Sequence, residues 1–299
     1  MHVAGILAGQ TAFITGGGGG IGSASARLMV RDGAAVMLMG RSQGTLNAAR
    51  DAILADYPNA VIDTFSGDSL KAEDVQEGLE RATRLEGNLS ILVPTVGGGG
   101  FMPILMHTAE TFREQLDINV ISCFLVVRYG VPLMKKGGSI VCISSTAAIM
   151  PFPWLGAYCA SKGAVEQFVR TAADELAPAG VRVNAVRPGM TRTNSTGEMF
   201  DNEGVIAPFI EQMPLGRAGV PDDIAQGVRF LAGPESGWMT GQSFAVDGGH
   251  ELRRNPDLTG VARGLFGDDV IDAVQRGESP ATGEVRARVG AEVADMGRS

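Results

Sequence analysis

Short apolar segments rich in β-branched residues alternate with helical stretches from residue 11 to about residue 249. This alternation predicts a parallel sheet covered by helices on both faces, because each pair of parallel strands needs a crossover helix. We therefore expect an α/β fold with a doubly wound, Rossmann-type sheet of about seven strands. The expected strands are 11–15, 35–39, 61–65, 89–93, 139–143, 182–186 and 243–246, and the expected helices are 21–32, 44–56, 71–85, 109–134, 157–177 and 221–231.

The pattern changes after Gly249. Residues 1–249 contain no linker or internal repeat and are expected to form one domain. Residues 250–299 are expected to form a helical extension that packs on this domain, with a frayed end after residue 279 where Gly, Ala and charged residues dominate. One apolar helical stripe is predicted in the extension from Val261, Leu265, Phe266, Val270, Ile271 and Val274.

Composition narrows the classes of function. A net charge of −8 gives no overall basic surface, so nucleic acid is not an expected partner. Three cysteines without a CxxC or a Cys/His cluster indicate neither a disulfide framework nor a metal site, and they favour a reducing compartment. Stretch 89–106 is apolar but interrupted by prolines and four successive glycines, so no membrane span is expected there. Because the N-terminus lacks the features of a secretory signal, we expect a soluble, cytoplasmic protein.

A glycine-rich junction follows the first expected strand. The sequence TGGGGGIG, Thr15 to Gly22, leads directly into a helix. Such a strand–glycine–helix junction lets backbone amides approach a pyrophosphate at the N-terminus of the helix. The alternative is a merely flexible turn, because five glycines satisfy many looser patterns.

The end of the second strand indicates which dinucleotide would bind. In Met39-Gly40-Arg41-Ser42 no acidic side chain is available for an adenosine ribose, and the Arg41 guanidinium can pair with a 2′-phosphate. NADP(H) is therefore favoured over NAD(H), although Arg41 could also be a solvated side chain at the start of a helix. Asp68, just past the third strand, could accept a hydrogen bond from adenine or cap the following helix.

Catalytic side chains are predicted near the middle of the chain. Tyr158 and Lys162 are four residues apart, so on a helix they share one face, and we expect the ammonium to lower the pKa of the phenol. Ser144 and Ser145 end an apolar strand at the edge where ligands bind, and Ser145 is the better donor to a substrate carbonyl. Asn119 lies within the long helix, where it could bend the helix, hold a water, or simply be a satisfied core amide.

Together these features resemble the classical short-chain dehydrogenase/reductase family. TGGGGGIG, Asp68, Asn119, Ser145, Tyr158 with Lys162, and RPGMTRT occur in the order of that family, with thirteen positions from Ser145 to Tyr158. The resemblance covers about residues 8 to 249.

The resemblance implies a role for each catalytic residue. Tyr158 would be the general acid in reduction and the base in oxidation, and Ser145 would orient the carbonyl oxygen. Lys162 would hold the nicotinamide ribose and perturb Tyr158, and Asn119 would position a water that relays protons from Lys162. Residues 194–214 would form the substrate lid, although their apolar side chains could equally be the inner face of a surface helix. The family also implies a homo-oligomer, a dimer or a tetramer.

A cofactor-binding set follows from the same resemblance and from the strand ends. It consists of Gly16, Gly20, Ile21, Gly22, Arg41, Ser42, Asp68, Ser69, Gly97, Tyr158, Lys162, Pro188, Gly189 and Thr193.

Two departures from the family pattern affect this expectation. The family's Asn-Asn-Ala-Gly after the fourth strand is replaced by Pro94, Thr95, Val96 and Gly97. The lost amides remove hydrogen bonds, so the segment toward the substrate is expected to sit differently. Gly19 occupies the place of a basic residue found in many NADP(H)-dependent members, so the cofactor preference depends on Arg41 and Ser42.

The leading hypothesis is an NADP(H)-dependent oxidoreductase that interconverts a carbonyl and a secondary alcohol on a small molecule. An enoyl or dienoyl thioester reductase of the same family is the enzymatic alternative, and intact Ser145 and Tyr158 favour carbonyl chemistry. A nucleotide-sensing protein without turnover is the alternative from another class, and the altered segment after the fourth strand is its support.

Overall fold

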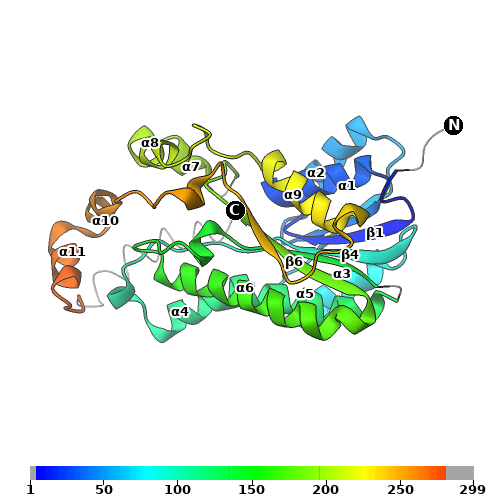
Figure 1. Cartoon of the computed structure of the whole chain (residues 1–299), viewed down its shortest axis with the longest axis horizontal. Coiled ribbons are helices and arrows are strands. Elements are labelled where there is room, and N and C mark those ends of the chain that lie inside the picture. Colours follow the sequence, from blue (N-terminus) through cyan, green and yellow to red (C-terminus); the bar gives the residue numbers. More distant parts are fainter. Residues whose placement is uncertain (1–4, 136, 195, 281–299) are drawn as a thin grey trace.

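A single sheet of seven parallel strands forms the centre of the molecule, seen edge-on between two layers of helices in Figure 1. The computed structural model describes residues 5–135, 137–194 and 196–280. The strand order is β3-β2-β1-β4-β5-β6-β7, which confirms the doubly wound α/β fold. The strands are β1 (Gln10–Thr15), β2 (Ala35–Gly40), β3 (Ile62–Ser66), β4 (Asn88–Pro94), β5 (Gly138–Ile143), β6 (Val181–Pro188) and β7 (Ser243–Val246).

Helices cover both faces of this sheet. One layer is formed by α1, α2 and α9, and the other by α3, α4, α5 and α6 (Figure 1). The helices are α1 (Gly20–Arg31), α2 (Gln43–Asp56), α3 (Ala72–Ala82), α4 (Ala109–Leu116), α5 (Ser122–Gly130), α6 (Gly156–Leu176), α7 (Gly197–Phe200), α8 (Glu203–Glu211), α9 (Pro221–Ala232), α10 (Thr259–Phe266) and α11 (Asp268–Gln275). Short 3₁₀ turns lie at Ile104–Met106, Val131–Leu133, Thr146–Ala148, Ala177–Ala179, Pro234–Ser236 and His250–Leu252.

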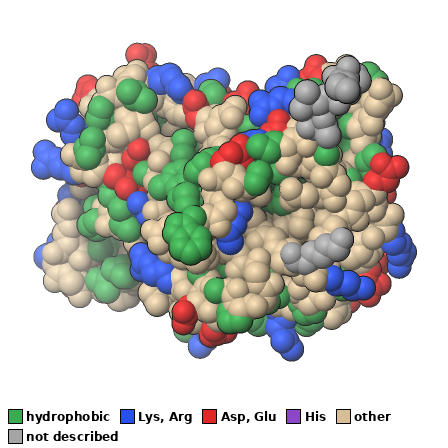
Figure 2. All heavy atoms as spheres, turned by 45° about the vertical axis from the view of Figure 1, so that its right-hand side comes forward, with side chains coloured by type: hydrophobic (Ala, Val, Ile, Leu, Met, Phe, Trp, Pro, Cys, Tyr) green, Lys and Arg blue, Asp and Glu red, His purple; other side chains and the backbone are tan. Residues whose placement is uncertain are grey.

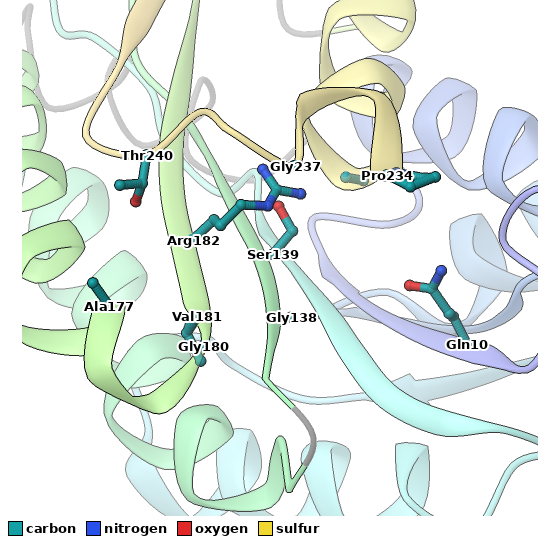
Figure 3. A pocket seen from close by; sticks show the side chains of 11 residues that line it. Gln10, Gly138, Ser139, Ala177, Gly180, Val181, Arg182, Pro234, Gly237 and Thr240 are labelled. Carbon is teal, nitrogen blue, oxygen red and sulfur yellow. The ribbon is translucent and has the colours of Figure 1, made fainter.

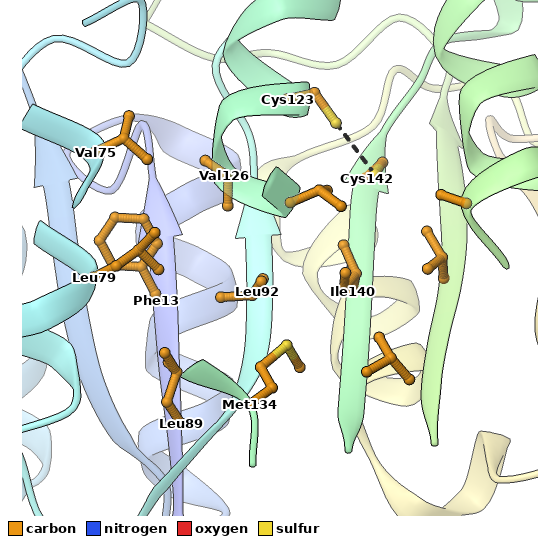
Figure 4. Close-up of a cluster of buried hydrophobic side chains, with 14 of the residues drawn as sticks. Phe13, Val75, Leu79, Leu89, Leu92, Cys123, Val126, Met134, Ile140 and Cys142 are labelled. Carbon is orange, nitrogen blue, oxygen red and sulfur yellow. Dashed lines mark hydrogen bonds between the residues drawn. The ribbon is translucent and has the colours of Figure 1, made fainter. Parts of the chain in front are cut away.

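The strands are apolar on both sides because both faces are covered. Phe13 points into the core under α3, α5 and α6, whereas its neighbour Ile14 points into the core under α1, α2 and α9. Leu92 and Ile91 divide between the two cores in the same way. Figure 4 shows the first core, with Leu79 of α3 beside Phe13 and with Cys123 of α5 facing Cys142 of β5. The two thiols are free, with their Sγ atoms 3.4 Å apart.

The expected long helix at 109–134 is present but is not regular. Its middle is a π-helical turn, Asp117–Ile121, that joins α4 to α5 and contains Asn119. By length and composition alone, the run Ala109–Leu133 could cross a membrane. In the structure one side of this run packs on β4, α3 and α6, whereas Ile121 and Phe124 are exposed.

The predicted single stripe in the C-terminal extension is wrong. Gly267 has φ +92° and ends α10, and α11 then starts in a new direction. Glycine adopts a positive φ at little cost, so the chain can leave the helix here. Phe266 and Ile271 are buried, while Leu265 is 39% exposed and faces outward. The expected fraying after residue 279 falls almost entirely outside the described residues.

Candidate active site

The carboxyl ends of the parallel strands bring most of the predicted site residues to one edge of the sheet. The glycine loop follows β1, Arg41 follows β2, and the Thr95–Gly100 segment follows β4. Ser145 follows β5, and Gly189 follows β6. Ligands of open α/β sheets bind at this edge, because the loops here leave a crevice where the direction of winding reverses.

The glycine loop has the close backbone approach that a pyrophosphate site needs. Gly16 adopts φ +65°, and a Cβ on Gly22 would lie 2.4 Å from the Gly16 carbonyl oxygen. Only glycine fits these two positions, and Gly19 then begins α1 with its first amides pointing toward the loop. A Cβ on Gly20 would lie 3.4 Å from a Thr193 methyl carbon, so the structure brings Thr193 to this loop.

At the end of β2, Arg41 is exposed and Ser42 has a structural role. The Ser42 hydroxyl oxygen accepts a hydrogen bond from the Thr45 amide at 3.4 Å and caps α2. The Arg41 carbonyl accepts one from the Ser66 hydroxyl, which ties β2 to the end of β3. The guanidinium therefore extends from an anchored backbone next to a helix N-terminus.

Asp68 shapes the turn before α3. One of its carboxylate oxygens accepts a hydrogen bond from the Leu70 amide at 3.0 Å, and its own amide donates to Asp74. The N-cap of α3 is Lys71, so Asp68 does not cap that helix. Ser69 is buried beside it.

Tyr158 and Lys162 lie on the first two turns of α6, as their spacing predicts. The Lys162 ammonium group is buried and donates a hydrogen bond to the Ile143 carbonyl at 2.9 Å. Its Nζ lies 5.7 Å from the centroid of the Tyr158 ring. The Ser145 hydroxyl lies near the phenol and partly opposes the rise in its pKa. The three side chains therefore form one group at the end of β5.

The prediction that Lys162 lowers the pKa of Tyr158 is wrong for this structure. Burial raises the pKa of Tyr158 above its ordinary value, and the hydrogen bond with Ser145 only partly opposes this. Burial also lowers the pKa of Lys162 to about 8. Desolvation disfavours the charged form of both groups, and it is the largest cause of both shifts.

Ser144 and Ser145 have different surroundings. Ser145 begins the 3₁₀ turn at Thr146–Ala148, and its hydroxyl accepts a hydrogen bond from the Ala147 amide at 3.2 Å. Ser144 is buried, and its hydroxyl has no partner within the described part of the chain.

Asn119 fixes the segment that follows β4. Its side-chain oxygen accepts a hydrogen bond from the Gly98 amide at 3.1 Å, and its Nδ2 donates to the Gly98 carbonyl at 2.9 Å. Nδ2 also donates to the Gln115 carbonyl at 2.9 Å. The geometry shows a hydrogen-bonded amide within an irregular, π-helical turn, and the predicted water at Asn119 stays a prediction.

Two residues that sequence reasoning missed replace the family's amides after β4. The Thr95 hydroxyl donates to the Thr15 carbonyl and so joins β4 to the glycine loop. The Gly100 amide donates to the Gln115 side chain at 3.2 Å. The segment Pro94–Gly100 is therefore held by hydrogen bonds of the Thr95 hydroxyl and the Gln115 side chain in place of the family's amides. The sequence offered only one signal for this, a hydroxyl residue at position 95.

Glycine is required where this segment crosses the catalytic group. A Cβ on Gly97 would lie 2.7 Å from the Asn119 side-chain oxygen and 2.9 Å from the Lys162 ammonium nitrogen. A Cβ on Gly99 would lie 2.9 Å from the Tyr158 ring, whereas one on Gly98 would meet open space. Gly97 thus lies directly over Lys162.

The segment after β6 closes the site from the other side. Pro188 ends β6, and a Cβ on Gly189 would lie 2.7 Å from Asp247. Helices α7 and α8 then occupy most of the region expected as a lid, and Figure 1 shows them next to α10 at one end of the molecule.

The large hollow in Figure 3 is elsewhere. It has a volume of about 410 Å³ and lies at the opposite edge of the sheet, where Gly138 and Val181 begin β5 and β6. Its Arg182 guanidinium already donates to the Leu231, Gly233 and Met239 carbonyls. This arginine supports the loop after α9.

The surface and the acidic residues give no sign of a different kind of site. On the face drawn in Figure 2, acidic and basic side chains are interspersed among apolar ones. Within residues 5–135, 137–194 and 196–280, no group of three or more His, Cys, Asp or Glu side chains could hold a metal ion.

The crowding over Lys162 can be tested by adding one methyl group. We expect Gly97→Ala to lower the free energy of unfolding by about 1–3 kcal/mol in urea, because the methyl group must displace Asn119 or Lys162. Gly98→Ala is the matched control, and it should change the stability by less than about 0.5 kcal/mol. Equal stabilities of the two variants would contradict this geometry.

Comparison with known proteins gives a consistent result. Residues 16–251 match the family described as enoyl-(acyl carrier protein) reductase. The chain is 36% identical over 242 residues to 2-(S)-hydroxypropyl-CoM dehydrogenase 3 of Xanthobacter autotrophicus, covering 79% of this chain and 94% of the relative. It is 34% identical over 245 residues to 3alpha-hydroxysteroid dehydrogenase of Mediterraneibacter gnavus, covering 81% and 97%.

Solved structures agree in fold. A short-chain type dehydrogenase/reductase from Mycobacterium ulcerans superposes with a TM-score of 0.84 at 33% identity, covering 89% of this chain and 98% of that one. The NADPH-bound short chain oxidoreductase from Pseudomonas aeruginosa, described as containing an atypical catalytic center, gives 0.75 at 33% identity, covering 80% and 95%. The chain belongs to the short-chain dehydrogenase/reductase family of NAD(P)-dependent oxidoreductases.

Proposed function

We propose that this protein is an NADP(H)-dependent oxidoreductase that interconverts a carbonyl and a secondary alcohol. The observation that carries the proposal is the group of Ser145, Tyr158 and Lys162 at the carboxyl edge of the sheet. A carbonyl oxygen placed beside the Tyr158 hydroxyl also lies beside Ser145, so two donors meet the atom on which negative charge develops.

Tyr158 is the proton donor in reduction and the acceptor in oxidation. Its raised pKa keeps the phenol protonated at neutral pH, which suits donation to an alkoxide. Ser145 donates a second hydrogen bond and fixes the direction of the carbonyl. The Lys162 ammonium nitrogen, 5.7 Å from the ring centroid, faces the phenolate that remains after the proton leaves.

Asn119 is a positioning residue in this proposal. Its amide is committed to Gly98 and Gln115, so it holds the segment over Lys162 and does not itself contact the substrate. The water relay expected from the family would start at the Lys162 ammonium group, one helical turn after Tyr158 on α6.

The described residues fit a nicotinamide dinucleotide. The glycine loop from Gly16 to Gly22, with Ile21, would hold the pyrophosphate at the start of α1. Arg41 and the first turn of α2 would hold a 2′-phosphate. The remaining cofactor contacts are Ser42, Asp68, Ser69, Gly97, Tyr158, Lys162, Pro188, Gly189 and Thr193. When bound, the nicotinamide supplies or accepts the hydride.

Reduction of a C=C bond in a thioester is the second candidate, and the description of the matching family favours it. The Ser145 hydroxyl at the phenol supports carbonyl chemistry instead, because it adds a donor where a reacting carbonyl oxygen would lie. A nucleotide sensor without turnover would not need Ser145 beside the Tyr158 phenol, so this arrangement favours an enzyme.

The proposed acid is tested by Tyr158→Phe. We expect turnover of ketones with NADPH to fall by about 10²–10⁴-fold, because the ring remains and only the hydroxyl group that donates the proton is lost. The dissociation constant of NADPH should change less than about twofold. Tyr57→Phe, at the end of α2, is the control and should retain full activity. Retained turnover in Tyr158→Phe would exclude this mechanism.

The cofactor preference is tested by Arg41→Asp. We expect NADPH binding to weaken by about 10- to 100-fold, because a charge-assisted hydrogen bond to phosphate is replaced by repulsion. NADH binding should hold or improve, since Asp can accept from a ribose hydroxyl. Titration by cofactor fluorescence measures both constants, with Arg84→Asp at the end of α3 as the control. An unchanged ratio of the two constants would refute the assignment of NADP(H).

We propose further that the chain forms a homo-oligomer through the outer side of α5 and α6. Ile121 and Phe124 are each 39% exposed there, and the Phe124 ring packs edge-on against Phe168. We expect sedimentation equilibrium to give a dimer or tetramer for the wild type and a smaller species for Phe124→Glu. A wild-type monomer at micromolar concentration would contradict this interface.

A further inference from the structure

Trp154 has two properties that the catalytic group does not explain. It lies four residues before Tyr158 with φ +72°, the only positive φ among the described residues other than glycine. This conformation is unfavourable for a bulky side chain and persists only where the surroundings fix it, which is typical of functional sites. Its indole nitrogen is buried and has no hydrogen-bond partner in the described ranges. A buried indole N–H normally has an acceptor, so a ligand is the natural source of one.

Three segments far apart in the sequence meet at Trp154. The indole packs against Met102 and Met106 of the segment after β4, and against Ala262 and Phe266 of α10. It also belongs to a second apolar cluster around Phe209 of α8, together with Met213 and Leu258. The backbone is fixed as well, because the Met102 amide donates to the Trp154 carbonyl at 2.6 Å. Trp154 therefore lies between the lid helices and the C-terminal extension.

Aromatic pairs join the same three segments. Phe101 stacks on Phe266 of α10, with centroids 6.5 Å apart and planes at 9°. Phe152 packs on Phe209 of α8 at 5.7 Å. The remaining partly buried members of these clusters are apolar: Met190, Met199, Ile206, Ile210, Val261 and Val270. We call this set of side chains the apolar chamber; it begins at Phe101, two residues after Gly99, which lies against the Tyr158 ring.

The C-terminal extension is tied down over the apolar chamber at both ends. The Asn255 side chain donates to the Pro151 carbonyl at 3.0 Å, and the Ser279 hydroxyl donates to the Leu105 carbonyl at 3.2 Å. Figure 1 shows α10 and α11 reaching past the end of the sheet, with α8 above them. The extension is thus a wall of the chamber.

Charge around the chamber disfavours an anionic ligand. Residues 197–213, which form the lid helices, include four acidic side chains and no basic one. Arg192 and Arg263 are paired with acidic residues, and Arg253 is exposed. The His250 ring packs edge-on against Phe209, and burial lowers its pKa, so it is uncharged at neutral pH.

We propose that Trp154 is a specificity-determining residue whose indole N–H donates a hydrogen bond to an acceptor on the non-reacting end of an uncharged, ring-containing carbonyl substrate. The apolar chamber encloses the rings, and the reacting carbonyl lies at Tyr158. This assignment of substrate class rests on the proposed carbonyl chemistry. Gly99, at the Tyr158 ring, and Met102, bonded to the Trp154 backbone, belong to one short segment, which therefore links the two polar contacts.

A matched series of ketones tests the hydrogen bond. The probes are 4-phenylcyclohexanone, its para-methoxy derivative and its para-carboxylate, with cyclohexanone as the small reference. We expect Trp154→Phe to lower kcat/KM about tenfold for the methoxy ketone, through KM, and less than twofold for the phenyl ketone. Removing one hydrogen bond between an enzyme and an uncharged ligand has an effect of about this size. We expect the wild type to turn over the carboxylate at least tenfold less efficiently than the phenyl ketone.

Fluorescence gives a readout that does not depend on turnover. The chain has two tryptophans, and Trp238 is fully exposed. In Trp238→Phe, which should keep wild-type kinetics, emission therefore reports on Trp154 alone. We expect the methoxy ketone to quench or shift this emission, and cyclohexanone to have no effect at the same concentration. Phe266→Ala, which opens the wall formed by α10, should raise KM for the aryl ketones and leave cyclohexanone unchanged.

The outcomes separate this inference from the proposed function. If ketones are reduced but Trp154→Phe has the same kcat/KM as the wild type for both the methoxy and the phenyl ketone, the inference is wrong and the proposed function is retained. If no ketone is reduced but the methoxy ketone still changes the Trp154 emission, ligand binding at the apolar chamber is supported and the proposed carbonyl chemistry is wrong. Preferred turnover of the carboxylate, or no response of Trp154 to any probe, would overturn the inference.

Discussion

Burial of the Lys162 ammonium group is the constraint around which the site is built. A cation at the carboxyl edge of the sheet needs a partner, and the Ile143 carbonyl supplies it. Gly97 passes so close above that no side chain fits, and Asn119 fixes the adjoining backbone through Gly98. The π-helical turn places Asn119 at this point, so an irregular helix, a glycine and a lysine are parts of one arrangement.

The same arrangement explains how the family's pattern tolerates the sequence Pro94–Gly97. The usual amides are absent, but Thr95 bonds the strand that carries the glycine loop, and Gln115 bonds Gly100. From Gly100 the chain continues into Phe101 and Met102, which pack on Trp154 and on the C-terminal extension. One segment, anchored by these two hydrogen bonds, therefore links the glycine loop to the apolar chamber, where selectivity for substrate would be determined.

The periodicity of apolar residues and the spacing of motifs were sufficient to predict much of the fold. All seven strands overlap their predicted ranges, because strands buried on both faces have a continuous apolar pattern. The adjacency of Ser145, Tyr158 and Lys162 followed from their places in that fold. The raised pKa of Tyr158 could not be predicted, since it depends on burial by distant segments. The break at Gly267 and the compensation by Thr95 likewise depend on backbone geometry and long-range contacts.

The most direct test is to titrate Lys162 itself. The chain has four lysines, so ¹³C-lysine labelling gives four side-chain signals, and Lys162→Met identifies one of them. The structure predicts that this signal titrates near pH 8, because burial lowers its pKa to about 8. An exposed lysine titrates near ~10.4. A midpoint for Lys162 at or above that of the other three would show that the amine is solvated, and it would contradict the account of the site.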